Sequence, residues 1–406
     1  MLRRSVPLVI VLCSFAIACT SRSVAPQRPA TSAPTEADSG RGGSTEEQEG
    51  GEEVHTTAER LDALDAARTA GVFGNASQAS VTSAATGWVG ERVVNPNVDD
   101  WEPAVTTDPN SPFIYILTTR YGQPAPCKAH CPSPYITLVV SSDNGATWGR
   151  QRPIWGVKGS NAQYDPTIYV VPDTGEVYAF FLNADRHAGF STLFIKSNDH
   201  GRTWTDPVRP SGQVSWADKP FLTSSASGKN VYVSWNGPTG GDLWVGVSHD
   251  YGATWTQTRV NQSKRYYYAY DAKTLPDGTV IFSESSFDYL CAGSGSFNCV
   301  SQGRVWHHVV ISRNKGATWT DRVVAKVPIG EDCFSNGCGE FYTGQTSAAT
   351  DANGQLLFAY EGAAVNAGPQ RVFVKTSADE GRTWSSPSAT RTSIPGSGRP
   401  IEPARS

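Results

Sequence analysis

The sequence predicts an all-β protein built from repeated units, and three observations support this fold class. An eight-residue pattern occurs five times, starting at Ser141, Ser197, Ser248, Ser312 and Ser377: "SSDNGATW", "SNDHGRTW", "SHDYGATW", "SRNKGATW" and "SADEGRTW". The copies start 51 to 65 residues apart, and periods near 50 are typical of stacked supersecondary units. The chain of 406 residues contains 39 glycines, 26 prolines and one methionine, which suits short strands joined by turns rather than a helical bundle.

Each copy is predicted to be the turn of a β-hairpin. An apolar or alternating segment precedes every copy ("YITLVV", "STLFIK", "LWVGV", "RVWHHVVI", "RVFVKT"), and a short polar segment follows it. The aspartate of the pattern, replaced by Asn314 in the fourth copy, can accept backbone N–H bonds across the turn. The glycine allows a positive φ, and the tryptophan can bury a large face between neighbouring units. A calcium loop is not expected, since the alternating oxygen ligands and the terminal glutamate of such loops are missing.

The pattern resembles the Asp box, or bacterial neuraminidase repeat, and over residues 90–390 the chain is similar to sialidase-like β-propellers. The resemblance implies four-stranded blades around a central channel, usually six in sialidases, with the Asp boxes between the third and fourth strands. Five blades are visible in the sequence. Either the ring has five blades, or a six-bladed ring is incomplete at the C-terminus.

The N-terminus is predicted to be an export signal. Arg3 and Arg4 precede an apolar run of signal-peptide length, and Cys19 follows "AIA", which resembles a bacterial lipobox. The resemblance implies a membrane-anchored lipoprotein with lipid on Cys19, and free secretion is the alternative. The expected segments are a signal peptide (1–18), a flexible linker (19–56), a short helix and lead-in (57–87), the propeller (88–395) and a tail (396–406).

Six further cysteines form three pairs that are close in sequence: Cys127 with Cys131, Cys291 with Cys299, and Cys333 with Cys338. Local disulfides are expected in an oxidising compartment, and a zinc site at "CKAHC" is the alternative. No metal or cofactor is otherwise expected. The net charge of −4, without a basic cluster, argues against nucleic-acid binding. The expected partners are a glycan or glycoconjugate and, through the lipid, a membrane, with the chain as a monomer.

The functional site is expected on the rim opposite the repeated turns, because the long loops lie there and loops on a rigid scaffold carry binding and catalysis. Carboxylates recur at the starts of the inner strands, and crowding can separate their pKa values into an acid and a base. The alternative is that each carboxylate caps backbone N–H groups of a neighbouring loop. The catalytic candidates are Glu102, Asp165, Asp218, Asp271 and Glu284, and the substrate-binding candidates are Trp101, Arg120, Trp216, Arg265, Tyr266 and Tyr342.

Several positions depart from the sialidase pattern. Sialidases clamp a sugar carboxylate with three arginines, but the position of the first one reads "DWEPAV" here. Arg120 resembles an arginine of the family, yet residues 121–140 contain no Asp or Glu to serve as the family's acid/base. Arg120, Arg186, Arg265, Arg304 and Arg371 are not expected to converge. Three functions stay open: a glycoside hydrolase without the arginine clamp, a non-catalytic glycan- or protein-binding propeller, and an exo-α-sialidase.

Overall fold

The computed structural model describes residues 93–94, 98–121, 132–154, 160–185, 189–214, 218–237, 242–261, 265–291, 299–328, 344–351, 354–365 and 370–389. Regular structure in these ranges consists of β-strands. In this part of the chain no helix has the length and apolarity needed to cross a membrane. The predicted signal peptide, Cys19, the linker and the helix expected within 57–87 lie outside the described residues.

The strands form five antiparallel sheets that follow one another in chain order, called blades 1 to 5. Blade 1 contains β1 (Asp99–Thr107), β2 (Ile114–Tyr121), β3 (Tyr135–Ser141) and β4 (Arg152–Pro153), and blade 2 contains β5 (Ser160–Val170), β6 (Val177–Asp185) and β7 (Gly189–Ser197). Blade 3 contains β8 (Asp218–Ser224), β9 (Val231–Asn236), β10 (Leu243–Ser248) and β11 (Thr256–Arg259). Blade 4 contains β12 (Tyr266–Thr274), β13 (Val280–Cys291), β14 (Cys299–Ser312) and β15 (Thr320–Pro328). Blade 5 contains β16 (Thr346–Thr350), β17 (Leu356–Ala363), β18 (Gln370–Ser377) and β19 (Ser388–Ala389).

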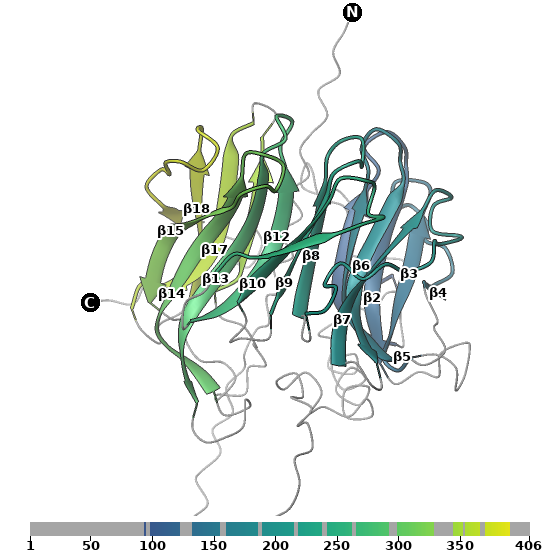
Figure 1. The fold of residues 1–406 in the computed structure, drawn as a ribbon, viewed down its shortest axis with the longest axis horizontal. Coiled ribbons are helices and arrows are strands. Elements are labelled where there is room, and N and C mark those ends of the chain that lie inside the picture. The colour runs from purple at the N-terminus through teal and green to yellow at the C-terminus, as the bar shows by residue number, and fades with distance from the viewer. Residues whose placement is uncertain are drawn as a thin grey trace, which may run out of the picture.

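The blades are arranged as in a β-propeller. The first strand of each blade lies beside the first strand of the next: β1 beside β5, β5 beside β8, β8 beside β12, and β12 beside β16. Figure 1 shows the sheets side by side, from the blue strands of blade 1 to the yellow strands of blade 5. Within the described residues, no comparable contact joins β16 back to β1. The predicted all-β propeller is therefore confirmed, with four-stranded sheets in four of the five described blades. Blade 2 has three strands and an isolated bridge between Phe194 and Val208 at its outer edge.

Apolar cores fill the spaces between successive blades. Leu138 of blade 1 and Phe181 of blade 2 belong to one such core, and Trp235 of blade 3 is fully buried in the next. The tryptophans of the repeated turns pack into the core that their own blade shares with the preceding one: Trp204, Trp255, Trp319 and Trp384. The sheets bury one another through these layers, so the repeated turns hold the blades together.

All five repeated turns have the same hydrogen bonds around a buried serine. In the first turn Ser141 Oγ accepts the Gly145 N–H at 2.8 Å and donates to Asp143 Oδ1 at 2.8 Å. The other oxygen of Asp143 accepts the Thr147 hydroxyl at 2.6 Å. These hydrogen bonds, those from Thr147 first, lower the pKa of Asp143 to about 2. In the fourth turn the Asn314 amide instead donates to the Thr318 hydroxyl at 2.9 Å, so the turn forms without a carboxylate.

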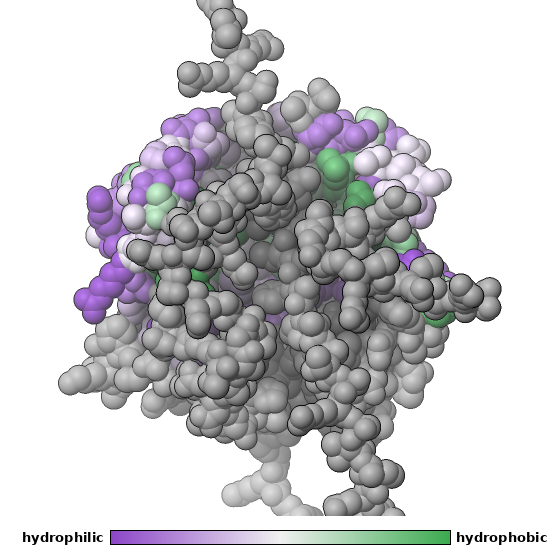
Figure 2. Space-filling model, turned by 180° about the vertical axis from the view of Figure 1, so that it is seen from behind, coloured by the Kyte–Doolittle hydropathy of each residue, from purple (hydrophilic) through white to green (hydrophobic). Residues whose placement is uncertain are grey.

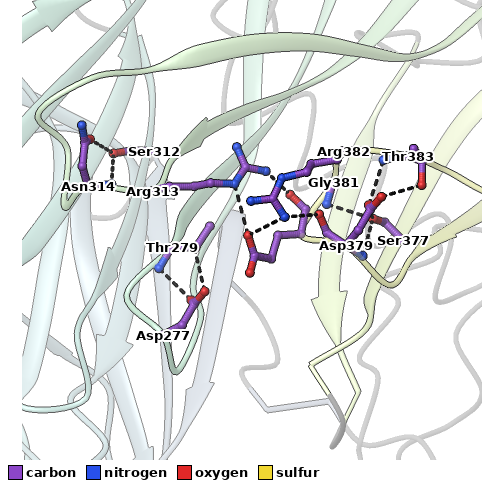
Figure 3. A network of polar contacts seen from close by, with 11 residues as sticks. Asp277, Thr279, Ser312, Arg313, Asn314, Ser377, Asp379, Gly381, Arg382 and Thr383 are labelled. Carbon is purple, nitrogen blue, oxygen red and sulfur yellow. Dashed lines mark hydrogen bonds and ion pairs between the residues drawn. The ribbon is translucent and has the colours of Figure 1, made fainter.

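The turns of blades 4 and 5 also contact each other directly (Figure 3). Arg313 Nε lies 3.2 Å from Glu380 Oε2, and Arg382 Nη1 lies 3.3 Å from the same oxygen. These side chains are partly exposed, so such a pair contributes about 0–1 kcal/mol. Where Figure 2 draws described residues in colour, the surface has hydrophilic areas and smaller hydrophobic patches.

Strand pairing places the repeated turns and the starts of the inner strands at opposite rims. Thr107, at the end of β1, pairs with Ile114, which pairs with Ser141 of the first repeated turn. Trp101, near the start of β1, pairs with Thr119 at the far end of β2. The predicted division into a rim of turns and a rim of candidate site residues follows from this register.

Candidate functional site

Three inner strands begin with a strained bulge. The backbone has a positive φ at Glu102 (53°), Asp165 (48°) and Lys219 (45°), and a β-bulge interrupts the pairing of the first two strands at each position. A proline follows each of these residues. A non-glycine residue with a positive φ costs roughly 1–3 kcal/mol and persists only where surrounding contacts impose it. The three residues therefore occupy equivalent, constrained positions.

The prediction that Asp218 shares this register was wrong. Asp218 pairs with Asn236 one residue before the bulge, and its Oδ1 accepts the Lys219 N–H at 2.8 Å. A cation, Lys219, therefore occupies the position where the sequence analysis placed a carboxylate. The dipeptides Glu-Pro, Asp-Pro and Lys-Pro in these strands were the signal that could have identified the register.

Charged side chains near the starts of the inner strands join blade 1 to blade 2, blade 2 to blade 3, and blade 4 to blade 5. Glu102 Oε2 accepts the Thr119 hydroxyl at 2.5 Å within blade 1 and the Asp165 backbone N–H of blade 2 at 2.8 Å. Lys219 Nζ of blade 3 lies 3.1 and 3.3 Å from the two carboxylate oxygens of Asp165. In blade 4, Asp271 Oδ2 accepts the Ala348 N–H of blade 5 at 3.0 Å. Two of the four predicted carboxylates thus cap backbone groups of the following blade.

Asp165 is held in its ionised form. Burial alone would raise its pKa, but the charge of Lys219 and hydrogen bonds from neighbouring side chains outweigh burial, so the pKa lies below its usual range. A general acid needs a pKa raised toward neutrality. Asp165 therefore does not have the properties of a proton donor.

Glu102, Asp165, Lys219 and Asp271, together called the charged ring, line a cavity of about 480 Å³. The wall of this cavity also includes Ile168, Tyr169 and Phe221 from blades 2 and 3. A second lysine on the wall, Lys273, has Nζ 3.6 Å from Asp271 Oδ1, and its side chain is 42% exposed. The cavity therefore combines carboxylates and ammonium groups at its charged ring with an apolar and aromatic wall.

Glu284 lies elsewhere and is itself fully buried, in a polar cluster of blade 4 that excludes the other predicted residues. Its Oε1 accepts the Asn261 amide at 2.9 Å, and the same amide donates to Asp321 Oδ2 at 2.8 Å. Burial first, and then the charge of Asp321, raise the pKa of Glu284 well above its usual value, while the Asn261 hydrogen bond opposes the shift.

His308 completes this cluster. Its Nδ1 lies 2.8 Å from Asp321 Oδ1 and its Nε2 lies 2.7 Å from Ser286 Oγ. The order Asp–His–Ser matches the hydrogen-bond order of a serine hydrolase triad. Ser286, however, has no exposed surface, so a substrate carbonyl cannot reach it in this structure. Ser286, His308 and Asp321 were not predicted from the sequence, although the pair "HH" within an apolar strand is an unusual signal.

The predicted arginines lie in different settings. Arg120 binds the Asp100 carboxylate through two nitrogens, with Nη2 2.9 Å from Oδ2, and also contacts Gln151. Arg265 stacks on Trp306 of blade 4, with Cζ 3.6 Å from the ring centre. Arg304 and Arg371 are exposed on β14 and β18. Arg186 lies outside the described residues.

The remaining predicted residues are only partly described. Trp101 donates its indole N–H to Asp99 at 2.7 Å and meets the Tyr121 ring edge-on. The backbones of Cys291 and Cys299 pair directly across β13 and β14. The disulfides stay a prediction, because the side chains of this pair and that of Tyr266 lie outside the description. So do Trp216 and Tyr342, and the other predicted disulfide cysteines: Cys127, Cys131, Cys333 and Cys338.

No family model and no curated protein matches the chain. Among solved structures it is similar to the Hadza microbial sialidase Hz136, with a TM-score of 0.47 and 16% identity over 71% of this chain and 58% of that one. A protein of unknown function from Dyadobacter fermentans has a TM-score of 0.46 and 16% identity, covering 69% and 79% of the two chains. The intramolecular trans-sialidase from Ruminococcus gnavus has a TM-score of 0.45 and 10% identity, covering 72% and 83%. The chain thus spans about 58% of the length of the Hadza sialidase.

Proposed function

We propose that this chain is an extracytoplasmic propeller that binds neutral glycans in its channel without hydrolysing them. The observation that carries the proposal is the cavity lined by the charged ring, which consists of Glu102, Asp165, Lys219 and Asp271. Its charged groups are held in place by contacts between blades, so they form a preorganised set of hydrogen-bonding groups. The resemblance of the repeated turns to Asp boxes supports a glycan as the ligand class.

The ring favours binding over catalysis. Glycoside hydrolysis by two carboxylates needs one group that donates a proton and another that acts as base or nucleophile. Asp165 has a lowered pKa, and Glu102 and Asp271 are engaged with backbone N–H groups of the next blade. Asp165 therefore lacks the raised pKa of a general acid, and one oxygen of Glu102 and one of Asp271 are occupied by contacts between blades.

The charges also define the ligand class. A sialic acid would bring its carboxylate toward Glu102, Asp165 and Asp271, whereas Arg120 is already bound to Asp100. A neutral sugar can donate hydroxyl groups to the carboxylates and accept from the lysines, while its apolar ring face packs on an aromatic wall. Neutral oligosaccharides are thus the better match.

Binding can be measured by titration calorimetry of the purified chain with neutral gluco- and manno-oligosaccharides and with 3′-sialyllactose. We expect the neutral ligands to bind and Lys273→Met to weaken binding by about tenfold, since a hydrogen bond to a charged group contributes about 1.5–3 kcal/mol. The matched control is Lys229→Met, because Lys229 lies outside the residues that line the cavity. Preference for the sialoside, or equal binding by Lys273→Met, would contradict the proposal.

A glycoside hydrolase is the second candidate, favoured by the raised pKa of Glu284 beside Asp321. Complete burial of Glu284 away from the cavity weighs against it. Incubation of the chain with the same oligosaccharides, followed by chromatography of the products, separates the two functions. Release of shorter sugars that is abolished by Glu284→Gln would establish hydrolysis and overturn the binding proposal.

The proposed location rests on the N-terminal sequence, where Cys19 follows a signal-like segment. Expression in a bacterial host with a radiolabelled fatty acid is expected to label the native chain and to leave Cys19→Ala unlabelled. Cys13→Ala, which alters the signal segment but leaves Cys19 intact, is the control and should be labelled. Release of an unlabelled native chain into the medium would instead support free secretion.

A further inference from the structure

We propose that Glu284, His308 and Asp321 form a binding site for one divalent transition-metal ion, with Zn²⁺ as the reference ion. The three residues come from adjacent strands, β13, β14 and β15, and Glu284 pairs directly with His308. Their ligand atoms lie within 4.8 Å of one another. The proposal is independent of glycan binding, because none of these residues lines the channel cavity.

The separations between the three ligand atoms would fit a metal ion after a contraction of the cluster. Zn²⁺ binds imidazole nitrogen and carboxylate oxygen at about 2.0–2.2 Å in a tetrahedral arrangement, so two ligands on one ion are separated by about 3.3–3.6 Å. His308 Nδ1 and Asp321 Oδ1 are already 2.8 Å apart. With all ligand atoms within 4.8 Å, the widest pair has to approach by at most about 1.5 Å.

A buried oxygen in the cluster supports the presence of a ligand. Glu284 is fully buried, and while its Oε1 accepts the Asn261 amide, its Oε2 has no hydrogen-bond partner among the residues that the structure describes. An unpaired carboxylate oxygen in such a place is costly unless a proton or a cation compensates it. A metal ion held also by His308 and Asp321 would provide that compensation.

The surrounding groups orient the three ligands as outer-shell partners do in metal sites. The Asn261 amide donates to one oxygen of Glu284 and one of Asp321, which leaves the second oxygen of each for the ion. Ser286 contacts His308 Nε2 at 2.7 Å, which fixes the ring and leaves Nδ1 facing Asp321. Asn261 follows the last strand of blade 3, so the bound ion would also connect blades 3 and 4.

The donor set selects the kind of ion. One imidazole and two carboxylates suit Zn²⁺ or Mn²⁺ better than Ca²⁺, which takes six to eight oxygen ligands. The side chain of Asp321 is 30% exposed, so the ion can enter from this side. A fourth ligand, such as water, would also be accommodated there.

Calorimetric titration of the EDTA-treated full chain with ZnCl₂, and in parallel with MnCl₂ and CaCl₂, tests the site. We expect one Zn²⁺ per chain, loss of this binding in Asp321→Asn, and a 10- to 100-fold weaker affinity in Asn261→Ala. The control is His249→Gln, which removes an exposed imidazole from a repeated turn and should leave binding unchanged.

Two measurements keep the result decisive. Thermal unfolding in EDTA confirms that each variant is folded before titration, and the visible absorption of bound Co²⁺ reports a site with protein ligands. Absence of stoichiometric Zn²⁺ and Mn²⁺ binding by the native chain would overturn the proposal. Equal binding by folded Asp321→Asn, or stronger binding of Ca²⁺ than of Zn²⁺, would also overturn it.

Discussion

Replacing Gly252 with alanine is expected to destabilise the protein by about 3 kcal/mol. Gly252 has a φ of +81°, and a Cβ at this position would lie 2.2 Å from Cε1 of Phe194 in the preceding blade. A left-handed backbone costs a non-glycine residue roughly 1–2 kcal/mol, and overpacking a core adds about 1–3 kcal/mol. Urea unfolding, followed by tryptophan fluorescence, measures the difference in the free energy of unfolding.

Gly145 is the matched control, because it occupies the same position of the first repeated turn with the same φ of +81°. A Cβ there would meet its nearest neighbour, Ile114 of its own blade, at an ordinary 3.5 Å. Gly145→Ala is therefore expected to lower the free energy of unfolding only by the cost of the left-handed backbone, about 1–2 kcal/mol. Equal losses for the two substitutions would show that close packing on the preceding blade does not determine the requirement for glycine.

The second large effect is expected from Lys219→Met, which removes the cation facing Asp165. Asp165 is 6% exposed, and breaking a buried ion pair on one side costs about 3–5 kcal/mol because the remaining charge is uncompensated. The pKa of Asp165 is lowered in the folded state, so this stabilisation is present above the ordinary pKa of aspartate. This stabilisation is lost as pH falls through the folded-state pKa of Asp165. The difference in the free energy of unfolding between Lys219→Met and the native chain should therefore shrink at acidic pH.

Two further variants identify the cause of this loss. Asp165→Asn combined with Lys219→Met removes both charges and is expected to be more stable than Lys219→Met alone. Lys273→Met removes a lysine that is 42% exposed beside Asp271 and should change stability by at most about 1 kcal/mol. A difference between Lys219→Met and the native chain that stays constant from pH 7 to pH 3 would contradict the assigned ion pair.

The contacts of the ring explain why strained backbones occur at the mouth of the channel. The bulges at Glu102 and Asp165 place charged side chains where they meet the next blade, and the gained hydrogen bonds offset the unfavourable φ. The same residues line the cavity. Inter-blade cohesion and the polar lining of the channel therefore depend on one set of side chains.

The repeated turns were predictable because their structure is local. Ser141, Asp143 and Gly145 lie within four residues of their hydrogen-bond partners, so the turn is encoded in eight consecutive residues. The hairpin strands before each turn and the packing of the tryptophans between blades followed from the same pattern. Fold class and the two rims could thus be derived without coordinates.

The composition of the candidate sites depended on contacts between distant segments. The bulge places Lys219 beside Asp165, which lies 54 residues away in the sequence, and the side chain of Asp218 also reaches the Asp165 carboxyl. Asn261 likewise joins Glu284 and Asp321 across separations of 23 and 60 residues.

By itself, the sequence determined the repeating all-β architecture and its repeated turns, since short-range hydrogen bonds and hydrophobic patterns act within each unit. Only the tertiary structure decided which charged side chains meet. Their pairing depends on strand register and on how one blade packs against the next, and a shift of one residue exchanges a carboxylate for an ammonium group.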